Sequence, residues 1–263
     1  MAETTLGQRM AAGEALLTAW SSIPEPLTTE AVARLGFDAV TLDMQHGGHS
    51  EESVLRAVPA VRMGGPHPIV RIPVGRFDMA SRALDFGAEC VIAPMVNTIE
   101  DARRFAAAMK YPPLGERSWG ATIAMLRSGA ADDGQGWLQT QNTRTLALAM
   151  IETREALAIA DDILAVDGID GVFVGPSDFS IAWTRGARID PSLEDMMEAI
   201  ALIAAKATAA GKHAAIYMVD PALVGRCYAM GYRLFALGSE YGYLAHGALG
   251  FIQKARDSLE SKA

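Results

Sequence analysis

The segment Gly168-Ile-Asp-Gly-Val-Phe-Val-Gly-Pro-Ser-Asp178 contains an apolar run, Gly171–Val174. The run is followed by Gly175-Pro-Ser-Asp178, which ends in an acid. An apolar run without alternating polar positions is typical of a strand buried on both faces, as in a parallel sheet. A second run of this kind, Leu146–Ile151, is followed directly by Glu152. Acids beside buried strands are uncommon unless they are paired or bind an ion. Glu152 and Asp178 therefore indicate both the fold and a candidate site.

Eight such runs alternate with helical patterns along the chain. The runs are Leu16–Trp20, Ala39–Leu42, Ile69–Ile72, Cys90–Ala93, Leu146–Ile151, Gly171–Val174, Ala214–Met218 and Leu234–Leu237. The clearest helical patterns are Ser50–Arg62, Asp78–Phe86, Thr98–Met109 and Asp195–Ala210. Glycines that would end a helix stand before four strands, at Gly36, Gly87, Gly211 and Gly231. Eight strand–helix units in 263 residues predict an α/β fold, a single (β/α)8 (TIM) barrel over residues 1–263.

The alternative architecture is an open, doubly wound sheet. That fold usually carries a glycine-rich nucleotide loop after its first strand, whereas here Ser21-Ser-Ile-Pro-Glu-Pro26 follows. No Pro/Ser-rich linker divides the chain, so we expect one domain. The longest region predicted to be irregular is Tyr111–Thr143, and a loop of that length in a compact domain is more often functional than idle.

Composition narrows the classes of partner. The net charge is −8 without a basic cluster, which argues against nucleic acid. No apolar run approaches the roughly 18 residues that span a membrane, and the amino terminus lacks the pattern of a signal peptide. Cys90 and Cys227 lie in apolar contexts and are expected to be reduced. We therefore predict a cytoplasmic protein with neither a nucleic-acid nor a membrane partner.

Polar residues gather at the carboxyl ends of the predicted strands, where barrel enzymes hold their active sites. They are Trp20 after the first strand, Asp43 and His46 after the second, Arg71 at the third, Glu152 after the fifth and Asp178 after the sixth. Two carboxylates completed by water suit a hard ion such as Mg²⁺ or Mn²⁺, so Glu152 and Asp178 are the candidate metal ligands. The alternative is that Glu152 is a first-turn acid and Asp178 a helix cap.

His46 is the candidate base, because its ordinary pKa suits proton transfer at neutral pH, and Asp43 could orient its ring. The alternative is a loop histidine beside a strand-ending acid. A zinc pair of His46 and His49 is disfavoured, because two glycines separate them and no third ligand is near. The other histidines, His67, His213 and His246, are expected to be structural.

Arg71 needs an anionic partner, which could be a substrate oxygen or a barrel acid. The amides of Gly175-Pro176-Ser177 precede a predicted helical turn and could hold a carboxylate. Trp20 could wall the pocket or belong to the core. A Schiff-base aldolase would need a buried lysine at a strand end, and none of the five lysines has that place in the sequence. No nucleophile-elbow pattern occurs either.

In order along nearly the whole chain, these motifs resemble those of the HpcH/HpaI aldolases, which are metal-dependent (class II) pyruvate aldolases with a (β/α)8 barrel. The matching motifs are Gly36-Phe-Asp38, Asp43-Met-Gln-His46, Pro68-Ile-Val-Arg71-Ile-Pro73, Leu84-Asp-Phe-Gly-Ala88, Ala93-Pro-Met95, Tyr111-Pro-Pro113, Ile151-Glu-Thr-Arg154 and Gly168–Asp178. At two positions near the site the chain differs from many members, with Gln45 in place of Glu and Met150 in place of Gln.

The resemblance implies a function and a site. It implies cleavage of a 4-hydroxy-2-oxo acid to pyruvate and an aldehyde, with Mg²⁺, Mn²⁺ or Co²⁺ held by Glu152 and Asp178. His46 would handle the proton with Asp43 behind it, Arg71 would stabilise the enolate, and amides near Gly175 and Ser177 would bind the carboxylate. It also implies a hexamer, a dimer of trimers, in which carboxyl-terminal helices such as Tyr243–Leu259 are exchanged between subunits.

Two related reactions and one binding role remain as alternatives. Oxaloacetate decarboxylation would pass through the same enolate and release CO₂ in place of an aldehyde. A CoA-thioester lyase of the same superfamily would need a CoA site, which the sequence does not reveal. A non-catalytic protein that binds oxo acids is disfavoured by the complete set of acids, histidine and arginine.

Overall fold

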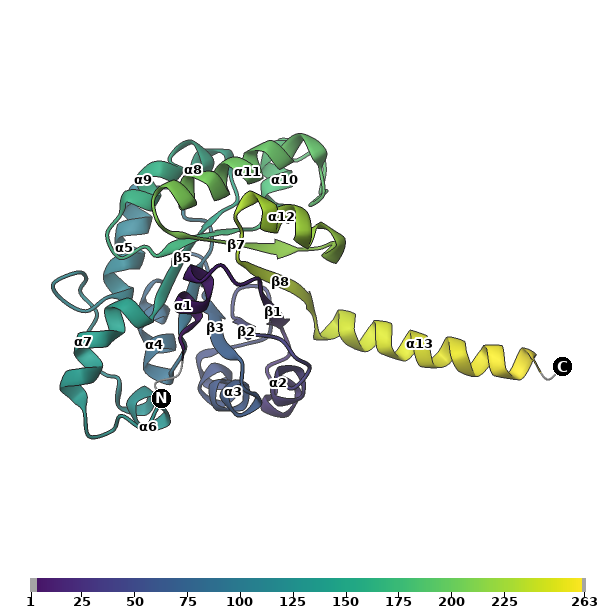
Figure 1. Ribbon diagram of the computed structural model, residues 1–263, viewed down its shortest axis with the longest axis horizontal. Helices are drawn as coiled ribbons and strands as arrows, with labels where there is room; N and C mark the ends of the chain where they lie inside the picture. Colours follow the sequence, from purple (N-terminus) through teal and green to yellow (C-terminus); the bar gives the residue numbers. More distant parts are fainter. Residues whose placement is uncertain (1–3, 262–263) are drawn as a thin grey trace.

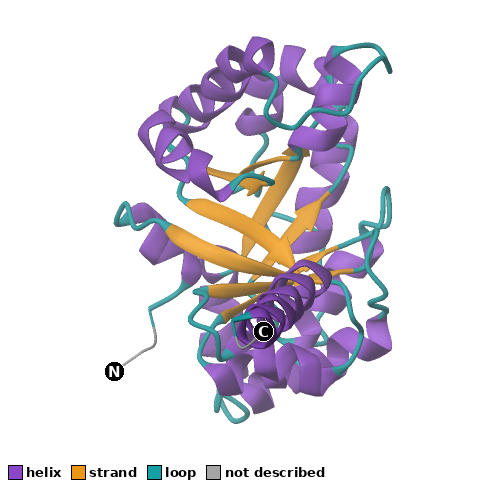
Figure 2. Ribbon diagram, turned by 90° about the vertical axis from the view of Figure 1, so that its right-hand side faces the viewer, coloured by secondary structure: helices purple, strands orange, loops and turns teal. Residues whose placement is uncertain are grey.

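The computed structural model describes residues 4–261, whose centre is a closed barrel of eight parallel strands in sequence order, with β8 paired to β1. The strands are β1 (Leu16–Ser21), β2 (Ala39–Asp43), β3 (His67–Arg71), β4 (Cys90–Ala93), β5 (Leu146–Ile151), β6 (Gly171–Val174), β7 (His213–Met218) and β8 (Leu234–Ser239). Helices surround the strands in both views (Figure 1, Figure 2). The predicted (β/α)8 barrel is confirmed.

Most of the helices connect consecutive strands on the outside of the barrel, whereas α1 (Leu6–Ala11) precedes β1 and α13 (Glu240–Glu260) follows β8. The others are α2 (Pro26–Ala33), α3 (Glu51–Gly64), α4 (Asp78–Phe86), α5 (Ile99–Met109), α6 (Thr122–Arg127), α7 (Gly134–Arg144), α8 (Arg154–Ala158), α9 (Ala160–Ala165), α10 (Pro176–Trp183), α11 (Glu194–Ala209), the 3₁₀ turn Pro221–Leu223 and α12 (Val224–Met230). Gly87 ends α4 and Gly231 ends α12 with positive φ angles of 104° and 113°, as predicted. Val58 and Phe105 are fully buried in the apolar layer between helices and strands.

A separate apolar cluster fills the inside of the barrel. Strand residues such as Ile69 and Leu148 are buried there, and α1 adds Leu6 and Met10. The backbone of α1 also lies against Leu146, the first residue of β5, because a Cβ built on Gly7 would be 3.1 Å from its side chain. The helix therefore covers the amino-terminal opening, and the carboxyl-terminal end is left for a pocket.

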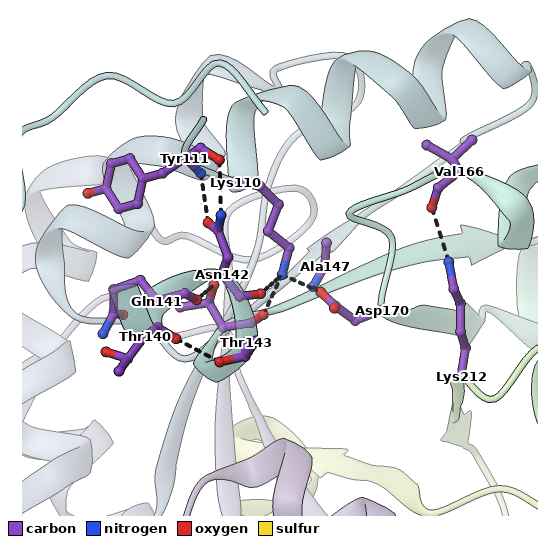
Figure 3. Close-up of polar contacts among 11 residues, drawn as sticks. Lys110, Tyr111, Thr140, Gln141, Asn142, Thr143, Ala147, Val166, Asp170 and Lys212 are labelled. Carbon is purple, nitrogen blue, oxygen red and sulfur yellow. Dashed lines mark hydrogen bonds and ion pairs between the residues drawn. The ribbon is translucent and has the colours of Figure 1, made fainter. Parts of the chain in front are cut away.

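An ion pair between a fully buried lysine and a partly buried aspartate, Lys110 and Asp170, lies near the amino-terminal ends of β5 and β6 (Figure 3). Lys110 follows α5 and is fully buried. Its Nζ donates to Asp170 Oδ2 at 2.7 Å, Thr145 O at 2.7 Å and Asn142 O at 2.9 Å. An ammonium has three N–H donors, so each of them has a partner. Lys110 is thus a structural cation that pairs with Asp170 near the amino-terminal ends of these strands.

The helix α13 projects away from the barrel (Figure 1, Figure 2). The predicted helix Tyr243–Leu259 is confirmed and is longer, since it begins at Glu240. Large apolar side chains on it are exposed, with 78% of Phe251 accessible to solvent. The others are Tyr241, Leu244, Leu249, Ile252 and Leu259. No helix within residues 4–261 combines the length and apolar character needed to cross a bilayer, and Cys90 and Cys227 are buried and unpaired.

The region predicted to be irregular, Tyr111–Thr143, contains two helices, α6 and α7. The prediction failed because Gly134 and Gly136 occupy the first turn of α7 and weaken the sequence signal of a helix. The side chain of Asp133 compensates by accepting a hydrogen bond from the Gly136 N–H at 2.8 Å. No described residue of this region lines the pocket at the carboxyl ends of the strands.

Candidate active site

A pocket of about 410 Å³ opens at the carboxyl-terminal ends of the barrel strands. It is lined by Trp20, Ser22, Asp43, His46, Arg71, Met150, Glu152, Phe173, Gly175, Pro176, Ser177, Asp178, Tyr217, Val219 and Ser239. Every site residue singled out from the sequence is in this set. The closure of the barrel brings them together although they are spread over more than half of the chain.

Asp43 and Arg71 form a buried, bidentate ion pair. The Arg71 Nε and Nη2 groups donate to the two Asp43 oxygens at 2.8 and 2.7 Å. The guanidinium lies over the Trp20 ring, 4.8 Å from its centroid, and the Trp20 indole N–H donates to Asp43 at 3.2 Å. Burial alone would raise the pKa of Asp43, but the hydrogen bonds and charge of Arg71 lower it below its ordinary value. Arg71 is thus held rigidly by a barrel acid, one of the two partners that the sequence left open.

His46 lies on the loop between β2 and α3, and its side chain is exposed. The carboxylate of Asp43 accepts hydrogen bonds from the backbone N–H groups of Gln45 at 3.0 Å and His46 at 3.4 Å. Among the described residues, the Asp43 carboxylate makes no hydrogen bond to the imidazole of His46. This differs from the expectation that Asp43 orients the ring. Asp43 instead fixes the backbone from which the imidazole extends.

Glu152 is a buried acid without a cationic hydrogen-bond partner among the described residues. Its Oε1 accepts from the Met95 N–H at 2.7 Å. The pKa of Glu152 is raised to about 7. Burial is the largest cause, and the negative charge of Asp178 also raises the pKa, whereas the hydrogen bond from Met95 and the positive charge of Arg71 lower it. A Cβ on Gly175 would lie 2.5 Å from Glu152 Oε2, so the absence of a side chain at this position makes room for the carboxylate.

Asp178 is the exposed partner of Glu152, in the first turn of α10. No cluster of three or more metal-binding side chains occurs within residues 4–261. An open pair of carboxylates fits a hard divalent cation that keeps water ligands, and here one of the pair is buried without a counter-charge from the described residues in direct contact. The same pair fits a softer metal poorly, because neither sulfur nor imidazole is part of it.

The segment Gly175–Ser177 forms the amino-terminal end of α10. Gly175 precedes Pro176, the first helical residue, and no side chain caps the turn. The free amides of this turn are donors with a favourable helix dipole beside the pocket. They can therefore hold an anionic oxygen next to Glu152 and Asp178.

Sequence reasoning did not assign several of the lining residues a place at the site. They are Ser22, Phe173, Tyr217, Val219 and Ser239, whereas Met150 was already placed near the site by its position two residues before Glu152. Phe173 stands two residues before Gly175, so the period of two along a strand could have placed it inside the barrel as well. Trp20 packs against Phe173 and Tyr217, with ring centroids 5.8 and 5.3 Å apart, so it belongs to the pocket wall and to the core.

The fold and the pocket define a (β/α)8-barrel enzyme whose site combines a carboxylate pair, a histidine and a paired arginine. The sequence profile of the HpcH/HpaI aldolase/citrate lyase family matches residues 17–247, and the chain belongs to this family. The resemblance inferred from the motifs is confirmed. The protein is accordingly a lyase of the aldolase type.

Known proteins agree with this assignment. The chain is 38% identical to a hydroxypyruvate/pyruvate aldolase of Rhizorhabdus wittichii over 93% of this chain and 95% of that protein. It is 33% identical to a 2-keto-3-deoxy-L-rhamnonate aldolase of Klebsiella pneumoniae, covering 86% and 83% of the two chains. A crystal structure of an HpcH/HpaI aldolase/citrate lyase family protein from Burkholderia cenocepacia superposes with a TM-score of 0.84 at 26% identity, over 97% of this chain and 100% of that one.

Proposed function

We propose that the protein cleaves a 4-hydroxy-2-oxo acid into pyruvate and an aldehyde, and catalyses the reverse addition, with the help of a divalent metal ion. The observation that carries this proposal is the common pocket of Glu152, Asp178, Arg71 and His46. The relatives named as pyruvate and 2-keto-3-deoxy-L-rhamnonate aldolases support the reaction class.

Glu152 and Asp178 would hold the metal ion, with water completing its shell. Mg²⁺, Mn²⁺ and Co²⁺ are the candidates that suit two carboxylate ligands. When bound, such an ion supplies a Lewis acid that polarises the keto group of a 2-oxo acid. It would also supply the positive charge that the buried Glu152 lacks.

Side chains and backbone amides of the pocket carry out the other steps of the reaction. The amides at Gly175 and Ser177 bind the substrate carboxylate. His46 accepts the proton of the C4 hydroxyl, the C3–C4 bond breaks to release the aldehyde, and its electron pair forms the enolate. Arg71 stabilises the enolate oxygen, because Asp43 engages only Nε and Nη2 and so leaves Nη1 for it. Protonation at C3 then gives pyruvate.

The test is pyruvate release from a panel of 4-hydroxy-2-oxo acids, with and without a chelator. Chelation should abolish release, and Mg²⁺, Mn²⁺ or Co²⁺ should restore it. Asp178→Ala and Glu152→Gln should remove the activity, whereas Glu155→Gln, which changes an exposed acid three residues further on, should not. Full activity of metal-free Asp178→Ala would sink the proposal. Oxaloacetate as the better substrate, with CO₂ as product, would replace cleavage by decarboxylation.

The proposed assembly is a homo-oligomer, a hexamer built as a dimer of trimers in which α13 packs on a neighbouring subunit. The exposed apolar side chains of α13 and its projection from the barrel support this assembly (Figure 1). Mass photometry should give six copies, and Phe251→Asp should lower that number; a wild-type monomer would contradict it. We propose a cytoplasmic location, which cell fractionation would test.

A further inference from the structure

Buried contacts behind the pocket join the first residue of α13 to the loop that carries His46. Glu240 is 1% exposed, and its Oε2 accepts a hydrogen bond from the Ser22 N–H at 2.7 Å. Ser22 O in turn accepts from the Gly48 N–H at 2.8 Å. Ser22, which itself lines the pocket, thus connects the root of α13 with the loop between β2 and α3.

His49 fastens the far end of the same loop. Its ring is buried, with Nε2 3.0 Å from Ser21 Oγ and Nδ1 3.0 Å from Ser53 Oγ. The Ser53 hydroxyl donates to Ser50 O, so Nδ1–H donates to Ser53 and Nε2 accepts from Ser21. Burial lowers the pKa of His49, against the charges of Glu240 and Asp43, and so favours this neutral form.

The two glycines of the loop let it lie close against the ends of β1 and β2. A Cβ on Gly47 would be 2.5 Å from Asp43 O, and one on Gly48 would be 3.0 Å from Pro24 Cδ. His46 directly precedes these glycines, and its exposed ring makes no hydrogen bond to residues 4–261. The position of the imidazole therefore depends on the backbone of the loop.

We propose that Glu240 is a positioning residue for His46: the carboxylate holds Ser22, Ser22 holds the loop, and the loop places the imidazole at the pocket. The inference rests on the role of His46 in the proposed function. The other oxygen of Glu240, Oε1, is buried without a hydrogen-bond partner among the described residues. An unsatisfied buried oxygen costs stability, and a positioning role would account for an acid at this buried place.

The first test is the steady-state kinetics of aldol cleavage by variants of the full chain. Glu240→Ala removes the acceptor for the Ser22 N–H and should lower kcat by about 10- to 100-fold with little change in KM, the scale expected for a misplaced catalytic group. Glu240→Gln keeps an acceptor oxygen and should stay within about threefold of wild type. His67→Ala, which removes a buried histidine at the start of β3, is the control and should leave kcat unchanged. A kcat of Glu240→Ala equal to that of wild type would overturn the inference.

The second test asks whether Glu240 acts through His46. In a His46→Ala background, Glu240→Ala should cause no further loss, because the group that it positions is already gone. A multiplicative loss would show a merely structural role and overturn the inference. If Glu240→Ala does not fold, His49→Ala replaces it in the same cycle, with the same expectation and the same contrary result.

The catalytic role of His46 and the positioning role of Glu240 can be told apart by their variants. If His46→Ala is as active as wild type, the base has been assigned wrongly, and the inference fails with it. If His46→Ala loses activity but Glu240→Ala and His49→Ala do not, the proposed function stands and only the positioning role is wrong.

Discussion

The two ends of the barrel each contain a buried ionisable side chain, and these two side chains differ in how many hydrogen-bond partners they have. At the amino-terminal end, the ammonium of Lys110 is fully buried and donates to three acceptors, one of them the carboxylate of Asp170 (Figure 3). At the carboxyl-terminal end, Glu152 is 1% exposed, yet only the Met95 N–H donates to it among the described residues, and its pKa is raised to about 7. A satisfied charge serves stability, whereas an unsatisfied acid in a pocket is poised to bind a cation.

The largest effect should come from a substitution of His46, at the carboxyl-terminal end of the barrel. His46→Ala should lose roughly 10²- to 10⁴-fold in cleavage rate, the usual scale for general acid–base catalysis, without a change in folding or metal affinity. His246→Ala, at an exposed histidine on α13, is the matched control. Steady-state cleavage assays decide the matter, and a His46→Ala rate within about threefold of wild type would assign the base elsewhere.

The next largest effect concerns protein stability and comes from the amino-terminal end of the barrel. Lys110→Met leaves Asp170 without its cation and should lower the free energy of unfolding by about 3–5 kcal/mol, while activity per folded molecule persists. Lys206→Met breaks a surface pair with Asp161 and should cost no more than about 1 kcal/mol. Urea denaturation measures both. Loss of activity in folded Lys110→Met protein would show that the two ends of the barrel do not act separately.

The charge of Glu152 should appear in the stability of the metal-free protein. Its folded pKa of about 7 exceeds the ordinary 4.5, so the folded state binds more protons between these values. The contribution of Glu152 therefore lowers stability as the pH rises through that range, by roughly 3 kcal/mol in total. Relative to wild type, Glu152→Gln should gain stability from about pH 5 to about pH 8 in urea unfolding with chelator. An equal pH dependence for the two proteins would contradict the raised pKa.

The smallest effect sharpens the role of Arg71. Arg71→Lys keeps the charge but loses the planar fork that Asp43 and Trp20 hold, and cleavage should fall by about 10- to 100-fold. Proton exchange at the pyruvate methyl group, followed by NMR, should fall together with cleavage, since both pass through the enolate. Unchanged methyl exchange would move Arg71 to the aldehyde half of the reaction, and unfolding would make it structural.

Much of the barrel could be predicted because its signals are local. Cys90–Ala93, Leu146–Ile151 and Gly171–Val174 were predicted with the bounds that the structure has, since a strand buried on both faces must be apolar throughout. The strand predicted at Ile69–Ile72 instead spans His67–Arg71. Its first residue was hidden because the buried His67 is polar and pairs with Glu89, a contact between segments.

What the sequence determined by itself is the order of strands and helices and the gathering of acids, His46 and Arg71 at one end, because strand periodicity and direction follow from neighbouring residues. Only the tertiary structure decided the partners of these groups. Asp43 pairs with Arg71, Glu152 has no cation paired with it among residues 4–261, and Glu240 reaches Ser22 from the other end of the chain. Such contacts depend on how β8 closes against β1, and no local pattern encodes the meeting of residues more than two hundred positions apart.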